Sequence, residues 1–318
     1  NGSTSANVGI RQQTAMQNNI TNNIINTSGT SSSVGVLVTT DSNNTVVDNN
    51  NITTSGSASA NHGINIATRS AGINLTNNVI NSSGTASNFG IVMDPSSNDS
   101  LILNNSIRTG GSGADNEGIS IYTRSFRNNV THNRVFTTGT TDNYGMRLLT
   151  NANFNTVEYN NVTTNGTGAT NIGILATTST QNNITNNIVA TNGTSANEGI
   201  RITTDSNNTA ISGNTITSGG SAGSNYGVYI ATRSFSNNVT HNVVNTSGTT
   251  TNVGVRIESG SNDTFVLNNS IFSGGSTSSN FGIYIIAQSF SNNITHNRIL
   301  ARGTSSSEGI RLQNNGDI

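Results

Sequence analysis

Residues 128–149 read NNVTHNRVFTTGTTDNYGMRLL, and this stretch holds every landmark of a repeat that recurs along the 318-residue chain. Asn133 is flanked by apolar residues and is followed six residues later by Gly139. An Asn-x-Gly tripeptide then ends at Gly145, and alternate positions after it are apolar. Alternation with a period of two indicates β-strands that bury one face. Each repeat therefore predicts three short strands separated by three turns.

Both landmarks recur at regular intervals. The glycine after the tripeptide start recurs every 26 to 28 residues, at Gly9, Gly35, Gly63, Gly90, Gly118, Gly145, Gly173, Gly199, Gly227, Gly254, Gly282 and Gly309. The asparagine recurs at Asn23, Asn50, Asn78, Asn105, Asn133, Asn160, Asn187, Asn214, Asn242, Asn269 and Asn297. Short strands with one apolar face bury it only by stacking on neighbouring repeats. We therefore predict an all-β fold, a single-stranded parallel β-helix (β-solenoid) of about 12 coils that forms one continuous domain over residues 1–318.

The two columns have different expected roles. Stacked asparagine amides can donate to and accept from the identical amides above and below, so the asparagines predict a ladder along the turns. The glycines are interpreted as turn glycines, at corners that require a positive φ or a close approach of the backbone. Strands of adjacent coils lie about 4.8 Å apart, so twelve coils predict a rod on the order of 58 Å long.

This pattern resembles the right-handed parallel β-helix proteins of the pectin-lyase-like superfamily, whose repeats carry a similar Asn-x-x-aliphatic pattern. The resemblance spans the whole chain and implies a right-handed helix. That family includes polysaccharide lyases, hydrolases and epimerases, adhesins, phage tailspikes and surface proteins without catalysis. The resemblance therefore implies a fold and leaves the activity open.

A longer period lies over the short one. Each repeat glycine of the first six coils has a counterpart 164 residues later, which indicates an internal duplication of residues 1–164 in residues 165–318. Asn1-Gly2 aligns with Asn165-Gly166, so the sequence opens and stops inside a repeat. Solenoids need polar caps to stay soluble, and none is evident. We expect either further repeats or end-to-end self-association into fibres.

Composition excludes several classes of function. The net charge is -1 with 13 basic residues, all arginine, so no basic stripe predicts nucleic-acid binding. No apolar run approaches the length of a membrane span, and the absence of cysteine removes disulfides and thiolate sites. We expect no cofactor and no metal. A chain rich in Asn, Ser and Thr and devoid of Lys is interpreted as extracellular or cell-surface, with possible N-glycosylation at Asn51, Asn161 and Asn245.

Candidate catalytic residues are sparse. Asp115 and Asp142 share an offset in adjacent coils, with Glu117 nearby, and paired carboxylates are the groups that glycoside hydrolysis uses. Their counterparts in the second copy are Ser279 and Ser306, so a coincidental surface cluster is the alternative. Arg69 could assist a lyase as a substrate clamp. We predict no catalytic site, and Asp115, Asp142 and Arg69 are the candidates if one exists.

Other ionisable residues predict structural contacts. Asp41 and Arg69 share an offset in consecutive coils, as do Asp205 and Arg233, which indicates ion pairs between coils. An outward column alternates cation and ring, which predicts stacking that stiffens this face or binds sugars; it consists of Arg201, Tyr229, Arg256, Tyr284 and Arg311. A histidine column is too widely spaced for one zinc ion; it consists of His132, His241 and His296.

The function that these observations favour is structural. We expect an extracellular β-solenoid that forms part of a surface fibre, filament or adhesin stalk and is not an enzyme. The alternative is a β-helix protein that binds or degrades a polysaccharide. Glycans are possible partners in either case.

Overall fold

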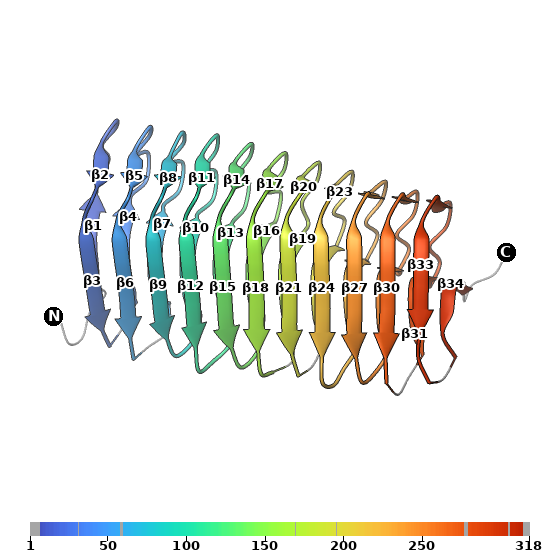
Figure 1. Cartoon of the computed structure of the whole chain (residues 1–318). Helices are drawn as coiled ribbons and strands as arrows, with labels where there is room; N and C mark the ends of the chain where they lie inside the picture. The colour runs from blue at the N-terminus through green and yellow to red at the C-terminus, as the bar shows by residue number, and fades with distance from the viewer. Residues whose placement is uncertain are drawn as a thin grey trace.

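The computed structural model describes residues 7–30, 32–57, 60–168, 170–194, 196–276, 279–304 and 306–313. All strands in these residues lie in three parallel sheets, and the coils stack along one axis into an elongated rod with its first and last coils at opposite ends (Figure 1). The predicted all-β parallel solenoid with three strands per coil is therefore confirmed. Asn1 and Gly2, which aligned with the second copy, lie outside the described residues.

Each sheet takes one strand from every coil, paired in parallel with the equivalent strand of the next coil. Sheet A consists of β1 (Asn7–Gln12), β4 (Ser33–Val38), β7 (His62–Ile66), β10 (Phe89–Met93), β13 (Asn116–Ile121), β16 (Asn143–Leu149), β19 (Asn171–Thr177), β22 (Asn197–Thr203), β25 (Asn225–Ile230), β28 (Asn252–Ile257), β31 (Asn280–Ile286) and β34 (Glu308–Gln313). Sheet B consists of the three-residue strands β2 (Asn19–Thr21), β5 (Val46–Asp48), β8 (Asn74–Thr76), β11 (Leu101–Leu103), β14 (Asn129–Thr131), β17 (Thr156–Glu158), β20 (Asn183–Thr185), β23 (Ala210–Ser212), β26 (Asn238–Thr240), β29 (Phe265–Leu267) and β32 (Asn293–Thr295). Sheet C consists of β3 (Ile24–Gly29), β6 (Asn51–Gly56), β9 (Val79–Gly84), β12 (Ser106–Gly111), β15 (Arg134–Gly139), β18 (Asn161–Gly166), β21 (Ile188–Gly193), β24 (Thr215–Gly220), β27 (Val243–Gly248), β30 (Ser270–Gly275) and β33 (Arg298–Arg302).

The core is a set of apolar columns that run along the rod axis. The middle residue of each sheet B strand points inward, and from Val47 to Val266 this column is no more than 1% exposed. Val130 is in register with Val157, which is in register with Ile184. Stacking identical positions from many coils is what buries enough apolar surface for a chain that is only 31% hydrophobic.

The predicted asparagine ladder is present in the turn between sheets B and C. From Asn23 to Asn297, each side-chain Nδ2 donates to the Oδ1 of the next ladder asparagine at 2.9 to 3.0 Å. The same Oδ1 accepts a bond from the backbone N–H of the preceding ladder asparagine, as Asn187 does from Asn160 at 2.9 Å. The ladder therefore satisfies buried polar groups at a corner of every complete coil.

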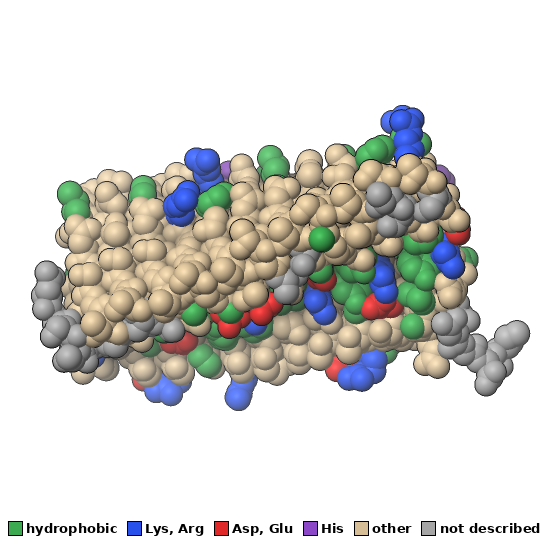
Figure 2. Space-filling model, turned by 90° about the horizontal axis from the view of Figure 1, so that it is seen from below, with side chains coloured by type: hydrophobic (Ala, Val, Ile, Leu, Met, Phe, Trp, Pro, Cys, Tyr) green, Lys and Arg blue, Asp and Glu red, His purple; other side chains and the backbone are tan. Residues whose placement is uncertain are grey.

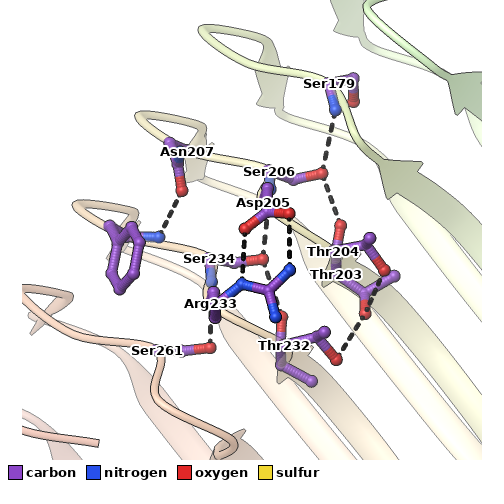
Figure 3. Close-up of polar contacts among 12 residues, drawn as sticks. Ser179, Thr203, Thr204, Asp205, Ser206, Asn207, Thr232, Arg233, Ser234 and Ser261 are labelled. Atoms are coloured by element: carbon purple, nitrogen blue, oxygen red, sulfur yellow. Dashed lines mark hydrogen bonds and ion pairs between the residues drawn. The ribbon is translucent and has the colours of Figure 1, made fainter.

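Two further polar columns were not predicted. The asparagine of the Asn-x-Gly tripeptide forms a second buried ladder from Asn61 to Asn280, with amide-to-amide bonds of 2.7 to 3.3 Å. A serine column follows sheet A, and in it the N–H of Ser206 donates to Ser234 Oγ at 3.3 Å (Figure 3). Its neighbours Ser179 and Ser261 continue the pattern.

The interpretation of the repeat glycines as turn glycines is wrong. They lie inside or at the edge of sheet A strands, and none of the twelve has a positive φ. Their cause is close packing: a Cβ on Gly199 would lie 2.2 Å from Ile216 Cγ2 and 2.6 Å from the backbone oxygen of Gly227. Close approach was one of the two expected reasons, and it is the one that applies.

The left-handed conformations fall on the residue before each ladder asparagine. Asn22 has a φ of 58°, and His132 and His241 occupy the same corner with φ values of 56° and 57°. Asparagine and histidine tolerate this conformation better than most residues with a side chain. The histidine column therefore reflects the geometry of a turn.

Candidate functional site

Exposed ion pairs connect consecutive coils at the turn after sheet A. Arg69 donates from Nε and Nη2 to the two carboxylate oxygens of Asp41, both at 2.9 Å. Arg233 makes the same bidentate contact with Asp205 at 3.0 and 2.9 Å (Figure 3). The hydrogen bond from Arg69 holds the pKa of Asp41 below its ordinary value. Both predicted ion pairs are confirmed.

A third pair of this kind was missed. Arg127 donates to both carboxylate oxygens of Asp99 at 2.7 and 2.8 Å. The two residues are 28 apart in the sequence, as Asp41 and Arg69 are. That spacing between an Asp and an Arg was the signal that could have found it.

The structure does not bring the three candidate catalytic residues together. Asp115 and Asp142 directly precede β13 and β16, whereas Arg69 lies beyond the opposite end of a sheet A strand and is bound to Asp41. Sheet A strands have five to seven residues, so roughly 20 Å of strand separates the two ends. Arg69 cannot contact a substrate held between the two carboxylates.

Glu117, the carboxylate expected near this pair, is part of the folded structure. It is 1% exposed and accepts bonds from Arg147 Nη1 and Ser120 Oγ. Burial raises its pKa, and the Arg147 guanidinium opposes that shift. Glu117 therefore acts as the buried partner of Arg147 on the outer face of sheet A.

The outer face of sheet A carries the predicted column of alternating arginine and tyrosine. The guanidinium carbon of Arg201 lies 5.1 Å from the Tyr229 ring centroid, and that of Arg256 lies 5.6 Å from the Tyr284 ring centroid. Carboxylates that sequence reasoning missed complete the network: Glu198 is paired with Arg201, and Glu258 accepts from Tyr229 and Arg256. Figure 2 shows acidic, basic and apolar side chains gathered in a band on the face turned to the viewer. Cation–π contacts and ion pairs together order this face.

Glu198 predicts a pH dependence of stability. Burial raises its pKa from 4.5 to about 7, although Arg201 opposes the shift. Between these two values the folded state holds a proton that the unfolded chain has released, so stability falls as pH rises through this window. We expect Glu198→Gln to raise the free energy of unfolding at pH 8 by on the order of 2 kcal/mol, and to have little effect at pH 4.

Urea denaturation at both pH values measures this effect. Glu158→Gln is the matched control, because Glu158 is a partly exposed carboxylate in sheet B, and we expect a change below about 0.5 kcal/mol. Equal stabilisation by Glu198→Gln at pH 4 and pH 8 would contradict the assignment of the burial effect to this carboxylate.

The remaining candidate residues lie at the surface. His132 stacks on Tyr159 with ring centroids 5.2 Å apart, and His241 Nε2 lies 3.3 Å from Asn268 Nδ2. In the part of the chain that the structure describes, no three His, Asp or Glu side chains are grouped so that they could hold a metal ion. The possible glycosylation residues point outward from sheet C and are exposed: Asn51, Asn161 and Asn245. No helix that could cross a membrane occurs in the described ranges.

Comparisons with known proteins agree on the fold. No protein-family model matches the sequence, and neither does any curated protein. Among solved structures, the chain is similar to the Streptococcus pneumoniae surface protein and adhesin PfbA, with a TM-score of 0.57 and 10% identity over 93% of this chain and 91% of that chain. It is also similar to the Dettilon tailspike protein, with a TM-score of 0.43 and 11% identity over 90% of this chain and 61% of that chain. The chain thus has the parallel β-helix fold that its sequence predicted.

Proposed function

We propose that this chain is a rigid segment of an extracellular or cell-surface fibre or adhesin stalk. The observation that carries this proposal is the asparagine ladder, which continues without a break from Asn23 to Asn297. Every coil is tied to both neighbours by three parallel strand pairings and by this side-chain column, so bending the rod would break many hydrogen bonds at once. A structure that is repeated from end to end suits a spacer.

Two further features belong to the same proposal. Within the described residues, β1 and β34 each pair on one side only, so each offers an open strand edge to a second copy. End-to-end self-association would continue the sheets from one copy to the next. The exposed asparagines of sheet C would accept N-glycans in a compartment that adds them.

Electron microscopy tests both the rod and the association. We expect single rods of about 50 to 60 Å at low concentration, from coils stacked about 4.8 Å apart, and filaments that lengthen as the concentration rises. Leu312→Lys places a charge on the open edge strand β34 and should leave single rods only. Flexible or globular particles would contradict the rigid spacer, and a concentration-independent length in the unmodified protein would contradict the association.

A further inference from the structure

Two shallow pockets on the outer face of sheet C are copies of each other. One has a volume of about 280 Å³ and lies over β9, β12 and β15. The other, of about 270 Å³, lies over β27, β30 and β33. Each residue that lines the first pocket has a counterpart 164 residues later in the second, namely Asn81, Ser106, Ile107, Arg108, Arg134 and Phe136. The duplication has therefore carried a surface feature as well as the fold.

Each pocket presents a small array of side chains in register. One row reads Val79, Ser106 and Arg134 in the first copy, and Val243, Ser270 and Arg298 in the second. The adjacent row begins with Asn81 or Asn245 and continues with larger side chains. The arginine, serine and asparagine thus keep the same relative positions in both pockets.

A phenylalanine ring lies beside the cation in both copies. Phe136 is half-buried, and the guanidinium carbon of Arg108 lies 4.8 Å from its ring centroid. In the second copy the ring is Phe272, and Gly274 leaves room for it: a Cβ there would be only 3.0 Å from two ring carbons. Aromatic faces beside hydrogen-bonding groups suit ligands with an apolar face and a polar edge.

The face around these pockets is basic. The sheet C strands contain no Asp or Glu, but they carry Arg108, Arg134, Arg298 and Arg302. None of these four takes part in an ion pair within the described residues, whereas Arg69, Arg127 and Arg233 are paired at the turns. Figure 2 shows basic side chains projecting beside apolar ones from its upper edge, the side of sheet C that faces the viewer in Figure 1. Charge complementarity therefore favours an anionic ligand.

We propose that the two pockets are paired subsites for an acidic polysaccharide. In each, a sugar ring packs against the phenylalanine, the arginine binds a carboxylate, and the asparagine and serine bond to hydroxyl groups. The subsites are six coils apart, about 29 Å along the rod, so one long chain can occupy both. Isolated subsites at that spacing do not suit a nucleic acid, which needs a continuous row of cations. This inference goes beyond the proposed spacer role and does not depend on it.

Binding of defined glycans to the immobilised protein tests the proposal. The protein is produced in a host that adds no N-glycans, because Asn245 lies inside the second pocket. We expect binding of hyaluronan, two short hyaluronan oligosaccharides per chain, and no binding of neutral dextran. Arg134→Gln with Arg298→Gln should weaken binding of short oligosaccharides by about tenfold or more. Arg298→Gln alone should reduce the stoichiometry to one and weaken binding of long hyaluronan by about 100-fold, because avidity is lost.

Matched controls separate this site from general charge. Arg69→Gln with Arg233→Gln removes the same charge at the same 164-residue spacing and should leave binding unchanged. Phe136→Ser with Phe272→Ser should weaken hyaluronan binding and leave any weak retention of polyphosphate unaltered. Equal binding of dextran or of polyphosphate, or an equal loss in the Arg69 and Arg233 control, would overturn the proposal. Circular dichroism and melting temperature confirm that each variant is folded.

Discussion

Replacing Gly199 by alanine is expected to lower the free energy of unfolding by about 3 kcal/mol. The added Cβ would lie 2.2 Å from Ile216 Cγ2 and 2.6 Å from the backbone oxygen of Gly227. The second contact is with the next coil of the same sheet, so it cannot be relieved by a change of rotamer. Relief would require adjacent coils to separate, which would stretch the strand pairings on both sides.

Urea denaturation measures this loss, with Gly219→Ala as the control. Gly219 lies in β24 on sheet C, and its added Cβ would come no closer than 3.2 Å to another atom, the Ser247 Oγ. We expect a cost below about 1 kcal/mol there. Similar costs at the two positions would show that the effect comes from chain entropy alone and would contradict the packing explanation.

The fold was predictable because the repeat makes each position report many times. The column from Val47 to Val266 is apolar throughout, and the ladder column is Asn in every complete coil. The glycine column was misread because recurrence shows that a side chain is excluded and does not show what excludes it. Only the coordinates distinguish a contact with Ile216 from a left-handed turn.

Predictability of the candidate site was lower, because function would reside in departures from the repeat. Glu198 and Glu117 share an outward column with apolar residues, and no sequence pattern indicates that both are buried. The paired pockets left a signal in the 164-residue period: Arg134 and Arg298 are counterparts, and Asn81 and Asn245 are too. The position of the phenylalanine differs between the copies, so its place beside the arginine becomes clear only from the strand register.

Asn160→Ala is expected to lower the free energy of unfolding by about 4 kcal/mol. The Asn160 side chain donates to Val130 O at 2.8 Å and to Asn187 Oδ1 at 3.0 Å, and its Oδ1 accepts from the backbone N–H of Asn133 at 2.9 Å. Alanine would leave buried groups in three coils without these partners, at about 1 to 3 kcal/mol for each group left unsatisfied. Asn161→Ala is the control, because this neighbour is exposed, and we expect a change within about 0.5 kcal/mol.

Asn160→Asp separates the hydrogen bonds of the ladder from its packing. An ionised Asp fills the same volume and still accepts from Asn133, but it cannot donate to Val130 O and it buries a charge. A protonated Asp regains one donor. Burial raises the pKa of such a carboxyl in the folded state, so the folded protein binds the extra proton and the variant should gain stability relative to the unmodified protein as pH falls from 7 toward 4. A pH-independent loss equal to that of Asn160→Ala would mean that packing, and not the continuous chain of amide bonds, holds the coils in register.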